Sequence, residues 1–289
     1  MTRRGWSRVG HAVMLGLVVL GSLFPIYFML VQSLKTPQED VFGHPLIVLH
    51  PTLDNFRELF GEAPEQGGII SRSLLPAYPF VEWLENTAVV FAGSLALTLA
   101  VSIMAGYALG RLRPPGWRWW RRVLFATYAI PHTILFIPLY QVVIRLRLDD
   151  SLLALLLVYP MLALPFCVWL LSAYWERLPR DIEDAARVDG AGRVAVFFRI
   201  ILPVSRPVIV AAGIFALGTI ASDFMLASVF LLDTHTQTIP AGLGSMDVSL
   251  EELTAVAGIN LTAIPIALFC AVFARSYVRG LTAAMVEGA

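Results

Sequence analysis

Six long stretches of this chain lack Lys, Arg and acidic residues, apart from a single Asp in one of them. Each stretch is 22 to 26 residues long. They cover residues 9–34, 86–110, 123–144, 151–175, 207–232 and 253–274. A helix of about 20 residues is long enough to cross roughly 30 Å of hydrocarbon. The pattern therefore predicts an all-α integral membrane protein with six transmembrane helices, the fifth of which contains Asp223.

The composition agrees with this class and excludes others. Hydrophobic residues make up 57% of the 289 positions and charged residues only 15%, which lies outside the range of soluble globular proteins. A soluble enzyme, a nucleic-acid-binding protein and a secreted disulfide scaffold are therefore excluded. Cys167 and Cys270 lie in apolar stretches, as buried free thiols do. The five histidines show no metal-ligand spacing, so we expect no metal site.

The basic residues of the chain are twenty Arg and one Lys, Lys35. A phosphate-binding P-loop needs Gly-rich backbone followed by Lys and then Ser or Thr. Lys35 follows Ser33 and Leu34 with no glycine nearby. We therefore expect that this chain has no nucleotide site and no cofactor of its own.

The basic residues are distributed unevenly between the predicted loops. With a cytoplasmic N-terminus, 16 of the 21 basic residues lie on the cytoplasmic side and 5 on the other. Because cytoplasmic loops of membrane proteins carry an excess of Lys and Arg, both termini are predicted to be cytoplasmic. The outer side then holds a loop at about 35–80 with a short helix at 54–60, and an acidic loop at 233–252.

The predicted cytoplasmic segment 176–206 begins with a helix pattern of its own. Pro179 and the acidic residues after it are typical of a helix start, and Gly190 is typical of a helix end. We expect about three turns of helix here. Ala185 and Ala186 would leave a flat surface that the backbone of another protein could approach.

A second helix is expected to run from Arg193 to Leu202 and to stop at Pro203. The apolar residues of this helix leave open a second interpretation of the whole segment 176–206. The two helices could form an amphipathic hairpin that lies on the lipid surface.

The segment resembles the EAA loop of permease subunits from binding-protein-dependent ABC importers. The residues that match the spacing of this motif are Asp184-Ala185-Ala186, Gly190, Ile200 and Leu202-Pro203. One departure is Asp184, where the motif usually has Glu; Asp keeps the charge and shortens the reach.

The rest of the chain is similar to the carbohydrate branch of this family, the maltose-permease second-subunit type. The residues that carry this resemblance are Pro25-Ile26-Tyr27, Ser33-Leu34-Lys35, Asn55-Phe56, Asn86-Thr87, residues 105–109, Ile130-Pro131, residues 137–140, Leu164-Pro165-Phe166 and residues 237–242. The resemblance covers nearly the whole chain.

The resemblance implies a MetI-like permease core with a cytoplasmic EAA coupling helix. It divides the chain into an N-terminal transmembrane helix plus external loop at 1–80 and a five-helix permease core at 81–289, with the EAA loop at 176–206. It implies a half-channel in the cytoplasmic membrane of a bacterium or archaeon. The implied partners are a second homologous permease subunit, two cytoplasmic ATPase subunits that bind ATP and Mg²⁺, an extracytoplasmic solute-binding protein and membrane lipid, but no nucleic acid.

The resemblance also assigns residues to the contact with the ATPase. These coupling residues are Glu183, Asp184, Ala185, Ala186, Asp189, Gly190, Ile200, Leu202 and Pro203. The EAA helix is expected to dock in a cleft of the ATPase and to transmit its motion to the membrane helices.

Residues of a substrate path are expected inside the spans. The candidates are Asp223, Phe224, Tyr140 and Phe166. A charged residue near the bilayer centre costs about 2.5–3.5 kcal/mol, so Asp223 should face the bundle interior or a water-filled path. It is either a structural residue bonded to a neighbouring helix or a direct contact of cargo or gate. The aromatic residues either stack on sugar rings or pack against other helices.

The identity of the cargo is open between several classes. An anionic cargo would favour Arg inside the spans, and these hold none, which favours a neutral mono- or oligosaccharide. Glycerol phosphate, a polyamine or a peptide are the alternative cargos. An intramembrane enzyme is a remote alternative, because its candidate groups His132, Tyr140, Tyr174 and Asp223 show no spacing that would form a nucleophile and a base.

Overall fold

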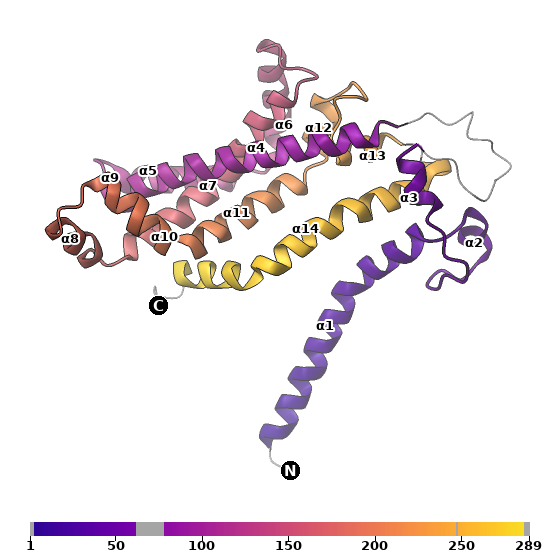
Figure 1. Cartoon of the computed structure of the whole chain (residues 1–289), viewed down its shortest axis with the longest axis horizontal. Coiled ribbons are helices and arrows are strands. Elements are labelled where there is room, and N and C mark those ends of the chain that lie inside the picture. Colours follow the sequence, from indigo (N-terminus) through magenta and orange to yellow (C-terminus); the bar gives the residue numbers. More distant parts are fainter. Residues whose placement is uncertain (1–2, 62–77, 247, 286–289) are drawn as a thin grey trace. The chain divides into compact units, whose positions relative to one another are not determined.

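The computed structural model describes residues 3–61, 78–246 and 248–285 (Figure 1). Every regular element in these ranges is a helix, as the sequence predicts. The chain divides into two compact units. Unit 1 comprises Met1–Val81 and Gly242–Pro265, and unit 2 comprises Glu82–Ala241 and Ile266–Ala289. The division predicted from the sequence, into residues 1–80 and 81–289, assigns residues 242–265 to the permease core. The two compact units group these residues with the N-terminal part, and the predicted division stays a prediction.

Unit 1 contains the first helices of the chain and part of the last. Its elements are α1 (Arg3–Ser33), α2 (Pro37–Phe42), α3 (Asp54–Leu59) and the part of α14 (Val248–Met285) up to Pro265. The buried Asn55 side chain donates to the carbonyl oxygens of Ser33, at 2.9 Å, and Lys35, at 2.8 Å. Asn260 of α14 donates to the carbonyl of Met29 in α1 at 2.8 Å.

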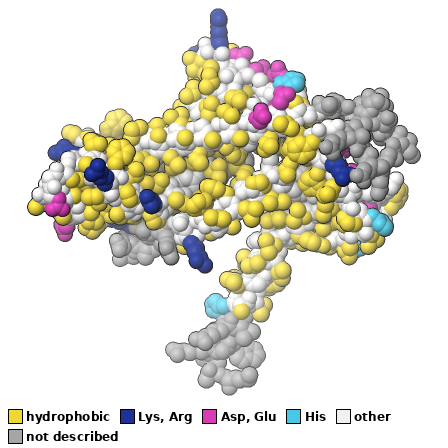
Figure 2. Space-filling view, viewed as in Figure 1, with side chains coloured by type: hydrophobic (Ala, Val, Ile, Leu, Met, Phe, Trp, Pro, Cys, Tyr) yellow, Lys and Arg dark blue, Asp and Glu magenta, His cyan; other side chains and the backbone are white. Residues whose placement is uncertain are grey.

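Unit 2 is built around α7 (Leu152–Arg177), whose buried residues include Tyr159, Leu170 and Trp175. The surrounding elements are α4 (Phe80–Tyr107) with a π-helical turn at Ala108–Leu112, α5 (Trp117–Tyr128), α6 (His132–Arg145), α11 (Arg206–Ala221), α12 (Met225–Phe230) and the end of α14. A short helix, α13 (Ile239–Ser245), crosses the boundary between the units. Hydrophobic side chains cover most of the visible surface of unit 2 (Figure 2), as expected of a surface in contact with lipid.

Four of the described helices are long and apolar enough to span a membrane. They are Gly10–Ser33, Phe80–Leu112, Leu152–Arg177 and Glu252–Val278. The expected third span at 123–144 is instead broken into α5 and α6, where Pro131 precedes the first residue of α6 and supplies no backbone donor. The expected fifth span at 207–232 is also broken, between α11 and α12. The number of membrane crossings therefore stays a prediction.

A sharp bend precedes α11. The helical segments α9 (Arg193–Val196), a π-helical turn at Phe197–Ile201 and α10 (Leu202–Val204) follow one another, and the direction then changes by 71°. The prediction that this helix stops at Pro203 is wrong. The π-helical turn lets the backbone N–H of Leu202 reach the carbonyl of Phe197, and the helix continues past the proline to the bend at Ser205.

The bend is fixed by a hydrogen-bonded serine. The hydroxyl of Ser205, which is fully buried, donates to the carbonyl of Ile201 at 2.6 Å. The indole Nε1 of Trp175, in the last turn of α7, donates to the same hydroxyl at 2.6 Å. The end of α7 and the start of α11 are therefore held together at this point.

The π-helical turn at the end of α4 approaches α7 closely. A Cβ on Gly110 would lie 2.5 Å from the carbonyl oxygen of Ser172 and 3.0 Å from its Cα. Both atoms belong to the α7 backbone, which cannot rotate away as a side-chain end can. Glycine at position 110 therefore allows this helix contact.

We expect that Gly110→Ala lowers the free energy of unfolding by about 1–3 kcal/mol, because it overpacks a backbone contact. The measurement is the melting temperature of the purified chain in detergent. Gly218→Ala is the matched control, because nothing lies within 4 Å of a Cβ at that helical glycine. Equal melting temperatures for the two variants would contradict the close approach.

Candidate functional site

The predicted coupling helix is present as α8 (Asp181–Val188). Three acidic residues occupy its first turn, where the helix dipole favours negative charge. Gly190 follows the helix with φ of 83°, a conformation that glycine adopts without strain. The N–H of Gly190 donates to the carbonyl of Arg187 at 3.0 Å, and that of Ala191 donates to the carbonyl of Ala186 at 2.9 Å. These two bonds form a Schellman motif, so the prediction that Gly190 ends the helix is confirmed.

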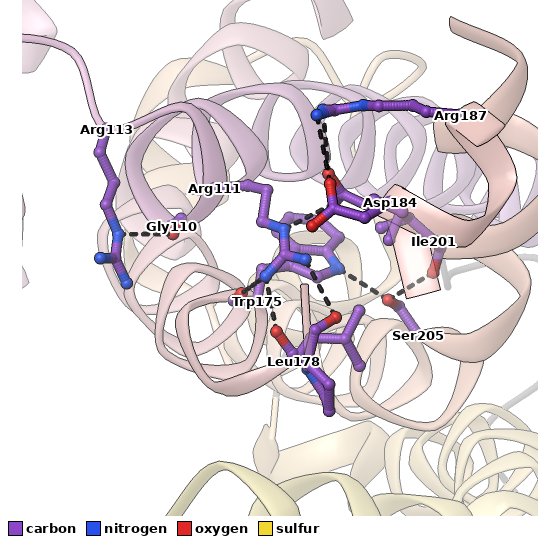
Figure 3. A network of polar contacts seen from close by, with 11 residues as sticks. Gly110, Arg111, Arg113, Trp175, Leu178, Asp184, Arg187, Ile201 and Ser205 are labelled. Carbon is purple, nitrogen blue, oxygen red and sulfur yellow. Dashed lines mark hydrogen bonds and ion pairs between the residues drawn. The ribbon is translucent and has the colours of Figure 1, made fainter. Parts of the chain in front are cut away.

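A single buried guanidinium, that of Arg111, holds α8 against unit 2 (Figure 3). Its Nε donates to Glu183 Oε1 at 2.5 Å. One terminal nitrogen donates to the carbonyls of Leu178, at 2.6 Å, and Trp175, at 3.4 Å, and the other donates to the carbonyl of Pro179 at 3.1 Å. Arg111 therefore joins the end of α4 to the last turn of α7, to the connecting loop and to α8.

The chemistry of arginine suits this position. A guanidinium presents its donors in a planar fork, and this one reaches one carboxylate and three carbonyl oxygens together. The side chains of Arg111 and Glu183 are only 5% and 8% exposed. Removing one partner of such a buried pair leaves a charge without compensation, which costs about 3–5 kcal/mol.

The two faces of α8 differ in exposure. Glu183 and Ala186 are buried, and Ala186 packs in the apolar core of unit 2. The prediction that Ala186 lies on a flat outer surface is wrong, because this face of α8 packs inward against the apolar core. Asp184, Ala185 and Asp189 are exposed. Their position leaves them accessible to a partner, and their coupling role stays a prediction.

Arg187 links two of the three acidic residues of this helix. Its guanidinium lies 3.5 Å from the carboxylate of Glu183 and 3.4 Å from that of Asp184. Only the Asp184 side chain is largely exposed, at 63%, and surface pairs of this kind contribute little to stability. Arg187 therefore restricts the position of the Asp184 side chain, but the stability of the fold depends little on this pair.

The remaining predicted coupling residues lie on the helical segment before the bend. Ile200, Leu202 and Pro203 are half-buried, and Ile200 packs against the core of unit 2. A groove of about 580 Å³ separates this segment from α8 and the end of α4. Met104, Tyr107 and Phe197 line its apolar part, and Arg180 and Arg193 lie among its charged residues.

Asp223 lies in the break between α11 and α12 and not within a continuous helix. Its Oδ2 accepts a hydrogen bond of 2.9 Å from the Tyr159 hydroxyl and one of 3.3 Å from the N–H of Ala227, and its Oδ1 accepts one of 3.4 Å from the N–H of Leu226. The carboxylate therefore binds α7 and the start of α12. The neighbouring Phe224 is 49% exposed.

The other two residues of the expected substrate path lie in different apolar clusters. Tyr140 stacks on Phe230, with 6.2 Å between ring centroids, and packs against the cluster that contains Tyr159. Phe166 packs on Phe215, with 3.9 Å between ring centroids, in a second cluster. The structure therefore brings Tyr140 and the Tyr159–Asp223 pair to one cluster and places Phe166 in the other.

At the other end of unit 2, motif residues hold the loop between α12 and α13. The Asn86 side chain donates to the carbonyls of His235, at 2.9 Å, and Gln237, at 3.0 Å. The Thr87 hydroxyl accepts the N–H of Ile239 at 2.8 Å. Glu82 hydrogen-bonds to His235 and raises its pKa above the ordinary value. This exposed contact weakens as the pH rises through the raised pKa.

Three residues on which the geometry of the site depends were not predicted from the sequence, namely Arg111, Trp175 and Ser205. One signal for Arg111 was available, because it is the first charged residue after the apolar stretch 86–110. Its partner Glu183 lies 72 residues away in the sequence, and no local pattern connects the two.

The geometry agrees with comparisons to known proteins. The chain is 30% identical over 289 residues to the trehalose transport system permease protein of Mycobacterium tuberculosis, covering 98% of this chain and 100% of the relative. It is 30% identical over 277 residues to the sulfoquinovosyl glycerol transport system permease protein of Agrobacterium fabrum, covering 94% and 91%. It is 26% identical over 281 residues to the trehalose/maltose transport system permease protein of Thermococcus litoralis, covering 94% of each.

A solved structure shares the fold. A chain of a bacterial ABC transporter involved in the import of the acidic polysaccharide alginate matches with a TM-score of 0.76 at 18% identity, over 95% of this chain and 98% of that chain. Residues 90–283 match the family described as binding-protein-dependent transport system inner membrane component. The resemblance seen in the sequence is thereby confirmed, and this chain belongs to the family of binding-protein-dependent transport system inner membrane components.

Proposed function

We propose that this chain is the permease subunit of an ATP-driven importer that translocates a sugar, a mono- or oligosaccharide, delivered by an extracytoplasmic binding protein. The observation that carries the proposal is α8, a short helix fixed to the bundle through Arg111 that presents exposed carboxylates outward. A sugar cargo is supported by relatives named as trehalose, trehalose/maltose and sulfoquinovosyl glycerol permeases.

The energy for transport comes from partner subunits. The sequence holds no P-loop, so two cytoplasmic ATPase subunits bind the ATP and Mg²⁺. A second homologous permease completes the channel. The complex lies in the cytoplasmic membrane of a bacterium or archaeon, with both termini and α8 on the cytoplasmic side, and 16 of 21 basic residues support this orientation.

The contacts of α8 provide a route for mechanical coupling. Arg111 connects α8 to the end of α4 and to the last turn of α7. Trp175 in that turn donates to Ser205 at the bend before α11. Closure of the ATPase pair moves α8, and this buried network transfers the motion to three membrane helices and shifts the balance between inward-facing and outward-facing states.

The test is uptake in proteoliposomes that contain this chain with its permease partner, its ATPase and its binding protein. Labelled trehalose and maltose are compared with glycerol 3-phosphate, spermidine and a dipeptide. We expect ATP-dependent uptake of a sugar. Uptake of only a phosphate ester, polyamine or peptide would overturn the sugar assignment and leave the permease assignment in place.

We expect that Arg111→Gln destabilises the chain by up to about 3–5 kcal/mol, because the Glu183 carboxylate loses its buried partner and keeps only the half-exposed Arg187. Melting temperature and sugar transported per ATP hydrolysed should both fall. The double variant Arg111→Gln/Glu183→Gln removes both charges and should recover part of the stability. Arg145→Gln, at an exposed position at the end of α6 and away from α8 in the sequence, is the control. Wild-type coupling in Arg111→Gln would show that Arg111 does not transmit motion.

Asp184→Lys should weaken ATPase binding about tenfold or more, because it reverses a charge at the proposed interface. The side chain is 63% exposed, so the melting temperature of the isolated chain should hardly change. Gly190→Pro should also abolish coupling, because proline cannot adopt the φ of 83° there. The measurements are affinity pull-down of the ATPase and sugar uptake. If both stay at the wild-type level in Asp184→Lys, α8 is not the coupling helix.

Asp223→Asn should preserve expression and ATPase assembly but lower sugar uptake or uncouple it from ATP hydrolysis. Asparagine keeps the shape and loses the charge that can accept paired hydrogen bonds from sugar hydroxyls. Tyr159→Phe, which removes only the hydroxyl donor, is the companion variant. Reduced melting temperature with normal uptake in both variants would assign Asp223 to a purely structural role.

A further inference from the structure

The first two turns of α5 combine arginine and tryptophan in a way that the transport mechanism does not use. The turn before the helix and its N-terminal half contain Arg113, Arg118, Arg121 and Arg122, interleaved with Trp117, Trp119 and Trp120. Three of the seven tryptophans of the chain therefore lie here. Such a mixture is typical of the interface between lipid headgroups and acyl chains.

Only two of these four arginines are paired with an acidic side chain, and they share a single carboxylate. The carboxylate of Glu176 in α7 pairs with Arg113, at 3.5 Å, and with Arg121. Within the described part of the chain, neither Arg118 nor Arg122 has an acidic partner within 4 Å. Both side chains are exposed. Two guanidiniums of unit 2 thus face outward without a counter-charge.

The ring of Trp117 contacts both paired arginines and one of the two unpaired arginines. The guanidinium carbons of Arg113, Arg118 and Arg121 lie 5.1, 5.3 and 4.9 Å from the centre of this ring. Contact with the face of an indole stabilises a cation and restricts its position. Arg118 is therefore held near the helix start and is not free to fold away into solvent.

The unpaired arginines share one face of α5 with apolar residues. Arg118 and Arg122 are four residues apart, so they are neighbours on the helix surface. Trp119, which is 59% exposed, lies beside them, and Phe125, which is 44% exposed, follows one turn later. Along the helix axis the order is Arg118, Trp119, Arg122 and Phe125, so the arginines lie toward the start of the helix and the last side chain of this face is apolar.

We propose that this face of α5, formed by Arg118, Trp119, Arg122 and Phe125, is a binding site for an anionic phospholipid. The two guanidiniums bind the phosphate and the negative headgroup, because their planar forks match phosphate oxygens. The exposed aromatic rings contact the glycerol region and the acyl chains. A soluble anion would gain nothing from these rings. The Phe125 ring contacts Trp169 at 5.1 Å between centroids, and an acidic protein surface would leave its exposed part without an apolar contact.

The bound lipid would stabilise the contact between α5 and α7. Glu176 already pairs with two arginines, one in α5 and one in the turn before it. A bound phosphate would offset the repulsion between these arginines and the two unpaired ones. The lipid thereby favours the arrangement in which Arg121 stays paired with Glu176.

The experiment uses the full-length chain in nonionic detergent with two brominated lipids, phosphatidylglycerol and phosphatidylcholine, which quench tryptophan fluorescence on contact. The test variant is Arg118→Gln/Arg122→Gln. The matched control is Arg145→Gln/Arg147→Gln, which removes two exposed arginines from the end of α6 and the turn that follows it. Melting temperatures without added lipid verify that all three proteins are folded alike.

In the wild type and the control we expect phosphatidylglycerol to quench at a lower concentration than phosphatidylcholine. The test variant should bind phosphatidylglycerol about 30-fold more weakly, from the loss of two guanidiniums near a negative headgroup, and phosphatidylcholine unchanged. Inorganic phosphate at the same concentrations should not compete.

Three results would overturn the proposal. Equal quenching by phosphatidylglycerol in the test variant and the wild type would show that the two arginines do not bind lipid. Full competition by inorganic phosphate would identify a site for a free ion. Unchanged lipid quenching in the test variant, together with its failure to co-purify with a permease or ATPase partner that the wild type retains, would identify this face as a protein interface.

Discussion

The guanidinium of Arg111 is the interaction on which the proposed coupling end of the molecule depends. It fills the space where the end of α4, the last turn of α7 and α8 meet, and it supplies donors to one carboxylate and three carbonyl oxygens. Those carbonyls belong to the chain where α7 ends, and each would otherwise lack a helical donor. The same side chain thus completes one helix terminus and anchors the next helix.

The elements that the sequence predicts correctly are those set by local patterns. The uncharged stretches mark α1, α4, α7 and α14 because length and hydropathy alone determine whether a helix suits a membrane. The end of α8 is also local, since Gly190 provides the left-handed conformation that closes the helix.

The elements that it predicts wrongly depend on the backbone hydrogen-bond ladder and on distant partners. A count of uncharged residues does not register that Pro131 and the residues around Asp223 interrupt a helix. It also does not show that Asp223 has Tyr159 as a partner 64 residues away. The buried face of α8 was not predicted for the same reason, because its partner Arg111 lies outside the segment 176–206.

The 71° bend at Ser205 has a mechanical consequence. The 16 residues of α11 extend about 24 Å beyond it at 1.5 Å per residue, and a change of roughly 10° in the bend angle would displace the far end by about 4 Å. That far end is the break that contains Asp223. The helix would therefore act as a lever arm that pivots at Ser205, because a change of this size at the bend would move Asp223 by more than the 2.9 Å of its hydrogen bond to Tyr159.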